Sequence, residues 1–418
     1  MPRGIAVCIG LLAALIAAAV CLDVSPQTAG PQPPRLGGPP LSLPQPVRPR
    51  FSPDIRVCLT DEPVERIEIA VDGGYRVQPV GVAQDLARGA RLPETIVTAT
   101  ADGLQIGRQT LAVSRVEIVP DRSPAVWAAG HQYRGRLRLF RQPGGRLLAV
   151  NVLPLEEYVA SVIDSEMPAA FPDEARRAQA IVARTYALWQ RERRHPLFDV
   201  FASTRSQRYL GFQYRSGDGR RLAGESAASR EIAADTAGMV STRGGRLFCT
   251  YYSAVCGGRT VAGRAVFADA TELASVPCAF CREAPLYRWT RTVPRSQFEA
   301  KLLELLAGEG LAFDSLRSAA ARDRPDGTVE LLVSDGRREH RIAAATLRSR
   351  LVGASLPSPR FALEPGPAEV TFHGRGHGHG VGLCQWGARG LASAGRTAAD
   401  ILRYYYPGSR VVALDGGG

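Results

Sequence analysis

Helical periodicity first appears in the stretch Leu155-Glu-Glu-Tyr-Val-Ala-Ser-Val-Ile-Asp-Ser-Glu166, where apolar residues recur at helical spacing. Pro168 and Pro172 follow it and are expected to interrupt the helix. A second helix is predicted from about Asp173 to Gln190, because acidic residues stand at its N-terminal end and apolar residues line one face. Glu166 is therefore expected at a helix end beside irregular backbone, where catalytic side chains often project.

The sequence before this stretch predicts strands. Short segments rich in β-branched residues are separated there by Gly, Asp or Pro. They are Ile55–Leu59, Arg66–Val71, Thr95–Thr100 and Thr110–Ser114. Two further strands, Tyr133–Phe140 and Leu147–Val152, flank Gly144-Gly145, which suits a hairpin turn. The predicted fold class is α+β, with a β-rich N-terminal region packed with a helical, Gly-rich region that carries the candidate site.

Later segments predict smaller elements. Phe298–Leu306 has the pattern of a surface helix, and Val329–Val333 with His340–Ala343 resembles a β-hairpin. Thr397 and Asp400 have capping-box spacing in front of a short C-terminal helix.

The N-terminus has the layout of an export segment. An apolar run from Ile5 to Leu22 follows a basic residue, so residues 1–22 are predicted to be a signal peptide. The run is near spanning length, and an uncleaved membrane anchor is the alternative. Val20 disfavours lipidation of Cys21, because a small residue is expected at that position. Residues 23–53 are rich in proline and glycine and are predicted to form a linker.

The composition restricts the class of protein. Hydrophobic residues make up 45% of the 418 residues and charged residues 22%, which excludes a collagen-like fibre and argues against wholesale disorder. The net charge is +12 and Lys301 is the only lysine, so the positive charge is almost all guanidinium. Such a surface favours anionic partners, or reflects a coding bias toward arginine. Export argues against nucleic acid, so none is expected as a partner.

Several motifs spread over the chain point to one family. They are Val150-Asn-Val-Leu-Pro-Leu-Glu-Glu-Tyr-Val159, Asp164-Ser-Glu-Met-Pro168, Ala175-Arg-Arg-Ala-Gln-Ala-Ile-Val-Ala-Arg-Thr-Tyr-Ala-Leu188, Ser206-Gln-Arg-Tyr-Leu-Gly211, Tyr251-Tyr-Ser-Ala-Val-Cys-Gly-Gly-Arg-Thr260, Gly376-His-Gly-His-Gly-Val-Gly-Leu-Cys-Gln-Trp-Gly-Ala388 and Asp400-Ile-Leu-Arg-Tyr-Tyr-Tyr-Pro-Gly408. In this order they resemble the sporulation stage II protein D family (SpoIID/LytB). The resemblance implies a peptidoglycan-acting protein outside the cytoplasmic membrane. Members of the SpoIID type are lytic transglycosylases acting on peptide-free glycan strands, whereas the LytB type enhances cell-wall amidases.

The resemblance also implies a domain layout. A SpoIID-like domain is expected over residues 54–410, followed by a tail at 411–418. Its expected parts are a β-rich part at 54–152, catalytic helices with the Cys/Gly motif at 153–260, an insertion with the C-x2-C motif and the hairpin at 261–365, and the Gly/His-rich loop with C-terminal helices at 366–410.

Glu166 is the candidate catalytic residue. Cleavage of a glycosidic bond needs a proton for the leaving oxygen, and a carboxylic acid with a raised pKa is a natural donor. Most glycosidases use two carboxylates. A lytic transglycosylase needs one, because the 6-hydroxyl of the muramic acid attacks its own anomeric carbon. The family's catalytic glutamate matches Glu166, although an arbitrary glutamate at a helix end is more often only solvated. Asp164, Glu156 and Glu157 are assigned to exposed helix positions.

Four further residues are candidates for substrate binding. The resemblance links Arg184 with function, and its guanidinium suits a muramoyl carboxylate; alternatively it braces the two helices by pairing with Glu166 or Glu174. Tyr252 and Gln385 are candidate sugar contacts, although a tyrosine in a strand more often lies in a core. His379 either fixes a Gly-rich loop near the glycan, polarises a substrate group or is a structural histidine. The alternating His377 and His379 are a weak signal for a metal.

The cysteines give a second signal. Cys249, Cys256, Cys278 and Cys281 combine C-x6-C with C-x2-C, which predicts either a zinc site or disulfides between the two pairs. Zinc here would be structural, since the proposed chemistry requires no cofactor. Cys58 and Cys384 are predicted to be a buried thiol pair or a disulfide.

These observations predict a lytic transglycosylase that acts on peptidoglycan strands. It is expected to be exported, either periplasmic or secreted, or anchored to the membrane by its N-terminus if the signal peptide is not cleaved. The alternative is a non-catalytic enhancer that binds peptidoglycan and a cell-wall amidase. A third, weaker hypothesis is a basic surface protein that binds anionic wall polymers without a catalytic cleft, for which binding should depend strongly on salt.

Overall fold

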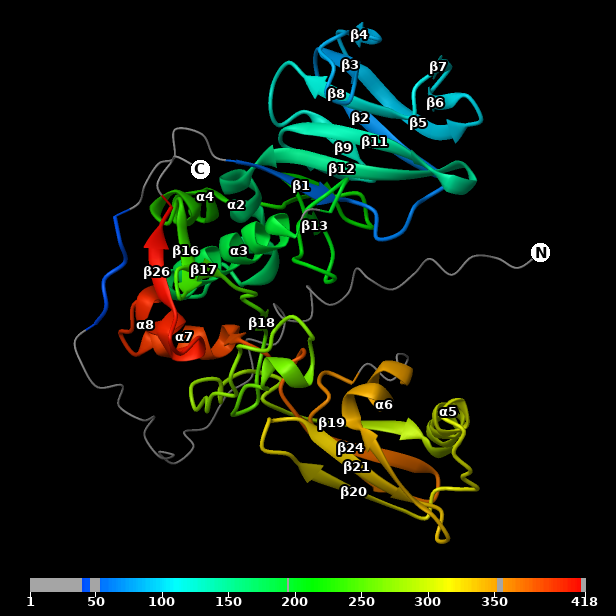
Figure 1. The fold of residues 1–418 in the computed structure, drawn as a ribbon, viewed down its shortest axis with the longest axis vertical. Helices are drawn as coiled ribbons and strands as arrows, with labels where there is room; N and C mark the ends of the chain where they lie inside the picture. Colours follow the sequence, from blue (N-terminus) through cyan, green and yellow to red (C-terminus); the bar gives the residue numbers. More distant parts are fainter. Residues whose placement is uncertain (1–39, 46–52, 194, 352–355, 415–418) are drawn as a thin grey trace. The chain divides into compact units, whose positions relative to one another are not determined.

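The computed structural model describes residues 40–45, 53–193, 195–351 and 356–414. The predicted signal or anchor at residues 1–22 and most of the predicted linker at 23–53 lie outside these residues. Within the described ranges, no helix is long and apolar enough to cross a membrane. Helices and sheets are both abundant, which agrees with the predicted α+β class (Figure 1).

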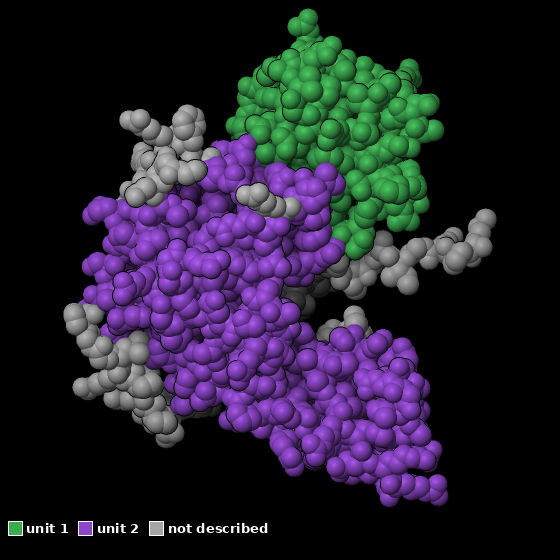
Figure 2. Space-filling view, viewed as in Figure 1, with its two compact units in different colours: residues 1–36, 59–152, 209–226 green, residues 37–58, 153–208, 227–418 purple. Residues whose placement is uncertain are grey.

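Residue contacts divide the chain into two compact units, which Figure 2 colours separately. Among the described residues, unit 1 holds 59–152 and 209–226, and unit 2 holds the described parts of 37–58, 153–208 and 227–418. The chain thus leaves unit 1 where helical periodicity begins in the sequence. It returns to unit 1 at Tyr209–Ser226, an excursion that the sequence did not predict.

Unit 1 is built from strands. They are β2 (Arg66–Val71), β3 (Tyr75–Pro79), β4 (Ala87–Gly89), β5 (Leu92–Thr100), β6 (Gly103–Ile106), β7 (Gln109–Leu111), β8 (Arg115–Pro120), β9 (Val126–Ala128), β10 (His131–Tyr133), β11 (Arg136–Gln142), β12 (Arg146–Pro154), β14 (Gln213–Arg215) and β15 (Arg221–Ala223). One sheet has the order β12-β11-β8-β3-β4 within this unit, and a second has the order β15-β14-β10-β9-β2-β5-β6-β7. The predicted hairpin is confirmed, because β11 and β12 pair antiparallel around the turn at Pro143–Gly145.

The helical part of unit 2 centres on one helix. Its helices are α2 (Leu155–Glu166), α3 (Asp173–Glu192), α4 (Ala227–Asp235), α7 (Gln385–Ser393) and α8 (Ala398–Tyr405), and its strands are β1 (Asp54–Cys58), β13 (Val200–Phe201), β16 (Met239–Arg243), β17 (Arg246–Leu247), β18 (Tyr252–Ser253), β25 (Leu383–Cys384) and β26 (Arg410–Ala413). Helix α3 contacts α2, α4, α7, α8 and β16. Its alanines allow this close approach on several faces, because they place little side-chain volume between neighbouring elements.

The predicted helix boundaries in this part agree with the structure. Helix α2 ends at Glu166, and Pro172 stands directly before the first turn of α3. The predicted capping box is present, since the side chains of Thr397 and Asp400 bond reciprocally to backbone N–H groups at the start of α8. Strand β26 pairs with β16 and so extends an ordered element into the predicted tail.

The described residues between 288 and 375, in unit 2, build a hydrophobic core of their own. Their elements are β19 (Arg288–Pro294), α5 (Arg295–Gly308), β20 (Ser318–Asp323), β21 (Val329–Ser334), β22 (Glu339–Ala343), α6 (Ala344–Arg350), β23 (Phe361–Pro365) and β24 (Glu369–Arg375). Two three-stranded sheets have the orders β19-β24-β23 and β20-β21-β22. Phe298, Phe361 and Phe372 lie in their shared core. The predicted surface helix and hairpin correspond to α5 and to β21–β22.

Candidate active site

Glu166 is the last residue of α2, and its carboxyl group is held by two hydrogen bonds. The backbone N–H of Arg208 donates to Oε1 at 2.6 Å. The hydroxyl of Tyr252 donates to the same carboxyl group. Pro168 follows two residues later, and because a proline disfavours helical backbone in the residue before it, the helix ends here. The glutamate is thus fixed at a helix end, as the sequence predicted.

The surroundings of Glu166 favour its protonated form. Burial raises the pKa of the carboxyl group and is the largest influence on it, whereas the hydrogen bonds from Arg208 and Tyr252 lower it. The pKa therefore lies above the ordinary value for a glutamate. Since the side chain retains partial exposure, a ligand can reach a carboxyl group that holds its proton closer to neutral pH.

A chain of hydrogen bonds orients Tyr252. Gln207 donates from Nε2 to the Tyr252 hydroxyl at 3.3 Å, and its Oε1 accepts from the hydroxyl of Tyr158 at 3.0 Å. The NH2 group of Gln207 acts as a donor and its carbonyl oxygen as an acceptor. The Tyr252 oxygen therefore accepts from Gln207, and its proton is available for Glu166. Tyr158, Gln207 and Arg208 were not singled out from the sequence. The signal was present, because Gln207 and Arg208 lie in the motif Ser206–Gly211.

Two other carboxylates of α2 are paired with arginines. Asp164 bonds to Arg176 at 2.9 Å, and Glu156 bonds to Arg184 at 2.5 Å. Both carboxylates are only partly exposed, and so is Glu157, so the prediction of exposed helix positions for these residues was wrong. Arg176 and Arg184 come from α3 and are among the largest fully buried side chains described, which explains why α2 turns acidic residues toward that helix.

Arg184 has a structural role in this fold. Its side chain has no exposed surface, and its guanidinium donates through Nε and Nη2 to Glu156 and through Nη1 to the carbonyl of Met239 at 3.0 Å. It therefore braces α2 against α3 and β16. The bracing interpretation therefore agrees with the structure, although the partner is Glu156 and neither Glu166 nor Glu174. The substrate-binding interpretation does not agree, because the guanidinium is fully buried.

His379 is held by the backbone on both sides of its ring. Nδ1 accepts from the N–H of Val381 at 3.1 Å, and the ring bonds to the backbone of Tyr252. Burial lowers the pKa of His379 to about 4, so the imidazole is neutral at pH 7. The histidine thus fixes the Gly-rich loop to the strand that carries Tyr252. This geometry favours the structural alternative and leaves no ring nitrogen for a metal.

Gln385 lies away from the exposed part of the site. It begins α7, is buried, and donates from Nε2 to Oε1 of Gln179 on α3 at 3.3 Å. The structure therefore brings Tyr252 to Glu166 and bonds the ring of His379 to the backbone of Tyr252. Gln385 belongs to the contact between α3 and α7. A direct sugar contact by Gln385 is not supported by this placement.

Four buried cysteines form a cluster, but not the four that the sequence predicted. The sulfur atoms of Cys256, Cys278, Cys281 and Cys384 lie within 4.8 Å of one another. Cys249 is buried elsewhere, beside Tyr251, so its inclusion was wrong. The predicted pairing of Cys384 with Cys58 is also wrong, because Cys384 belongs to the cluster and Cys58 does not.

The cluster has the chemistry of a tetrahedral metal site. Zn–S bonds of about 2.3 Å imply sulfur–sulfur distances of roughly 3.8 Å in a tetrahedron. The Cys256 and Cys281 sulfurs are 3.7 Å apart. The sulfur of Cys384 accepts backbone N–H groups from Cys256 and Gly387, each at 3.3 Å. Such donors stabilise thiolate charge around a bound cation. The residues therefore fit a zinc ion.

Comparison with known proteins agrees with the motifs. A family model described as stage II sporulation protein (SpoIID) matches residues 143–242, the segment that holds Glu166, Gln207 and Arg208. The stage II sporulation protein D of Bacillus amyloliquefaciens is 30% identical over 64% of this chain and 76% of its own length. An uncharacterized protein of Brachyspira hyodysenteriae is 28% identical over 86% of this chain and 92% of its own length. The amidase enhancer of Bacillus subtilis is 25% identical over 60% of this chain, which spans 40% of that relative.

Proposed function

This chain belongs to the SpoIID family of stage II sporulation proteins, and from that premise we propose that it is a peptidoglycan lytic transglycosylase acting on peptide-free glycan strands. The observation that carries the proposal is the environment of Glu166. A partly exposed carboxyl group with a raised pKa is oriented there by a backbone N–H and a tyrosine hydroxyl. That is the arrangement expected for a general acid.

The proposed reaction uses Glu166 twice. Its proton moves to the glycosidic oxygen as the bond between this oxygen and the anomeric carbon of N-acetylmuramic acid breaks. The 6-hydroxyl of the same muramic acid attacks that carbon and closes a 1,6-anhydro ring. The Glu166 carboxylate then accepts the hydroxyl proton, which restores the acid. The hydrogen bonds from Arg208 and Tyr252 would stabilise the negative charge of the carboxylate between loss of the first proton and uptake of the second.

The test is product analysis with matched variants. The purified protein is incubated with amidase-treated glycan strands, and the products are examined by mass spectrometry for 1,6-anhydro-muramic ends. We expect these ends with the wild type and with Glu192→Gln, which removes an exposed carboxylate at the end of α3. Glu166→Gln is expected to abolish them. Equal product from both variants would remove Glu166 from the chemistry.

The second candidate function is enhancement of a cell-wall amidase. The specific observation in its favour is the similarity to a protein named amidase enhancer. Here the protein would bind peptidoglycan and the amidase and would not need a proton donor. Stimulation of an amidase that persists in Glu166→Gln, together with no anhydro product from the wild type, would favour this function over the first.

A structural zinc ion is part of the proposal. Cys256, Cys278, Cys281 and Cys384 would hold it and would tie together loops that are far apart in the sequence. A bound ion of this kind supplies folding free energy and no step of the reaction. Disulfides are the less favoured alternative, because the four sulfurs surround one point rather than forming two bonded pairs.

Export completes the proposal. Residues 1–22 would direct the chain across the cytoplasmic membrane or anchor it there, and residues 23–53 would separate the folded units from the membrane. The proposed substrate is found only on that side. Fractionation of cells that express the full chain would test this, with a cytoplasmic location as the contrary result.

A further inference from the structure

A cavity of about 710 Å³ opens in unit 2, and Glu166 and its hydrogen-bond partners are not part of its wall. Residues of strands β19, β23 and β24 line one side of the cavity. Ala321 and Asp323 of β20 and Val329 of β21 also line it, as does Gly257, which follows the cluster residue Cys256. A volume of this size suits a ligand of one or two sugar rings. The proposed reaction leaves this cavity unused.

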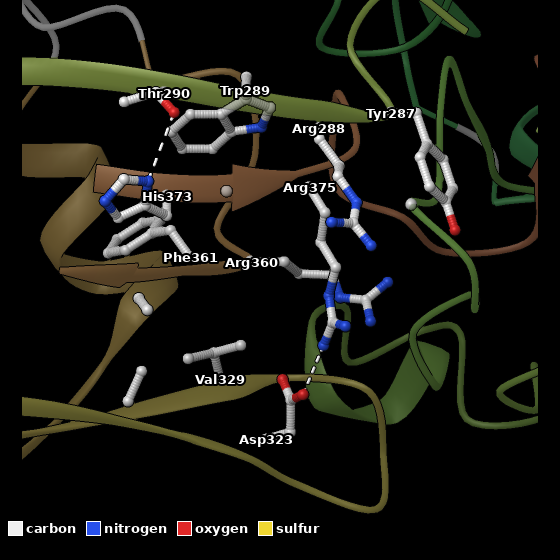
Figure 3. A pocket seen from close by; sticks show the side chains of 14 residues that line it. Tyr287, Arg288, Trp289, Thr290, Asp323, Val329, Arg360, Phe361, His373 and Arg375 are labelled. Atoms are coloured by element: carbon white, nitrogen blue, oxygen red, sulfur yellow. Dashed lines mark hydrogen bonds and ion pairs between the residues drawn. The ribbon is translucent and has the colours of Figure 1, made fainter. Parts of the chain in front are cut away.

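Arginine side chains dominate one side of this cavity. Figure 3 shows the guanidinium groups of Arg288, Arg360 and Arg375 gathered there, near Tyr287. Arg375 is paired with Asp323 at 2.5 Å. Within the described ranges, Arg288 and Arg360 form no ion pair with any carboxylate. The wall thus carries more positive than negative charge, and the excess is directed into the cavity.

Arg360 is the most informative of the three. Only 6% of its surface is exposed, and its Nη1 donates to the carbonyl of Arg259 at 2.6 Å and to that of Cys256. Its Nε is buried without a hydrogen-bond partner. A buried guanidinium with an unused N–H beside a second arginine favours an anionic ligand on this side of the cavity.

The opposite wall is flat and apolar. Trp289 is buried with its Nε1 bonded to the carbonyl of Gly376 at 2.9 Å, so its ring is fixed in place. The ring lies directly over Gly374, where an added Cβ would approach it to 2.0 Å. Phe361 also lines the cavity (Figure 3), with 2% of its surface exposed and the rest of its ring packed in the core. Flat rings opposite guanidinium groups suit a sugar that bears an acidic substituent.

We propose that this cavity is a second saccharide-binding site, in which Arg288 and Arg360 bind a sugar-borne carboxylate while the aromatic wall contacts the ring. The identity of the ligand as a peptide-free glycan strand rests on the proposed function, because such strands carry a free carboxylate on each muramic acid. A guanidinium fork matches a planar carboxylate in two parallel hydrogen bonds. Asp323 remains in the wall, and its negative charge disfavours a polyanion with one phosphate per glycerol unit more than a strand with one carboxylate per disaccharide.

The test is a binding measurement with a matched control. Every protein is the full chain carrying Glu166→Gln, so that strands are bound and not cut. Arg288→Gln removes an exposed pocket arginine without disturbing the Arg360 contact to the cysteine loop, and Arg291→Gln removes an arginine of the same strand that does not line the cavity. Affinity for amidase-treated strands is measured by calorimetry in low salt. Arg288→Gln is expected to weaken binding about fivefold, corresponding to one charge-assisted hydrogen bond at a partly exposed site. Arg291→Gln is expected to change it less than about twofold.

Two further arms identify the ligand class. Strands whose carboxylates have been converted to amides should bind equally to the parent protein and to Arg288→Gln. A poly(glycerol phosphate) chain should show no dependence on Arg288. Equal strand affinities for Arg288→Gln and Arg291→Gln would overturn the site, and Arg288-dependent binding of the phosphate polymer alone would overturn the carboxylate. Anhydro products are measured separately in the Glu166 wild type, so failure of the proposed reaction and failure of this site give different results.

Discussion

The buried pair of Arg184 and Glu156 allows a quantitative prediction about stability. Arg184 has no exposed surface, and the Glu156 side chain is 23% exposed. Removing one partner of a buried ion pair typically costs about 3–5 kcal/mol, because the other charge stays buried without compensation. Glu156→Gln keeps one acceptor oxygen, and the residual exposure lets water reach the site. We therefore expect a loss near the lower limit, about 3 kcal/mol of unfolding free energy.

A double-mutant cycle isolates the pair. Arg184→Met is expected to destabilise the protein by a similar amount, because it leaves the Glu156 carboxylate and the Met239 carbonyl without their donor. The combination of Arg184→Met with Glu156→Gln removes both charges and should be more stable than the sum of the single effects by about 2 kcal/mol. Urea unfolding is followed by tryptophan fluorescence, to which Trp189 on the same helix as Arg184 contributes.

The control is a more exposed ion pair between α3 and α4. Arg177 bonds to Asp235 at 2.9 Å, with side-chain exposures of 27% and 53%. Asp235→Asn should change the unfolding free energy by less than about 1 kcal/mol. If Glu156→Gln has an equally small effect, and Arg184→Met abolishes binding of glycan strands without loss of stability, the bracing role is refuted and Arg184 contacts substrate.

Three further predictions concern the acid and the cysteine cluster. Tyr252→Phe removes a hydrogen bond that lowers the pKa of Glu166, so this pKa should rise. Since the acid must be protonated to act, the alkaline limb of the kcat/KM profile for anhydro-product formation should move to higher pH. An unchanged limb would contradict the role of Tyr252. Elemental analysis should find no zinc in Cys384→Ser, which should also have a lower Tm, whereas Cys249→Ser should retain zinc. The reverse pattern would favour the four ligands predicted from the sequence. Gly387→Ala places a methyl group 1.9 Å from the Tyr405 hydroxyl and 2.7 Å from the Cys278 sulfur. This overpacking should lower the unfolding free energy by about 1–3 kcal/mol and reduce both zinc content and Tm. Full zinc content at wild-type Tm would contradict this packing.

The local elements were predictable from sequence, because their signals are local. Helix α2 shows a clear apolar period and ends at prolines, so its end at Glu166 follows from a dozen neighbouring residues. The capping box of Thr397 and Asp400 is likewise contained in four positions. Arg184 could not be assigned in this way. Its partner lies on another helix, and the choice among Glu156, Glu166 and Glu174 depends on how the helices pack.

The cysteine cluster shows the same limit. The C-x2-C spacing of Cys278 and Cys281 places two ligands on one turn, and Cys256 was recovered with them. The fourth position required knowledge of which distant strand lies alongside. Strand β25, which ends at Cys384, pairs in parallel with β18, and no residue spacing encodes that pairing. Cys249 is closer to Cys256 in sequence, but its thiol lies beside Tyr251 and not in the cluster.

The same strand pairing connects the cysteine cluster to the proposed catalytic acid, and a second contact connects it to the proposed saccharide cavity. Tyr252 of β18 lies opposite Leu383, and the next pair in the register is Ser253 with Cys384. A change in the position of Cys384 therefore acts on the backbone that carries the hydroxyl donor of the acid. On its other side, the cluster residue Cys256 offers its carbonyl to Arg360, a wall residue of the second cavity. Loss of the proposed zinc should consequently weaken strand binding at the cavity as well as catalysis, whereas substitution of the exposed Arg288 should affect binding alone.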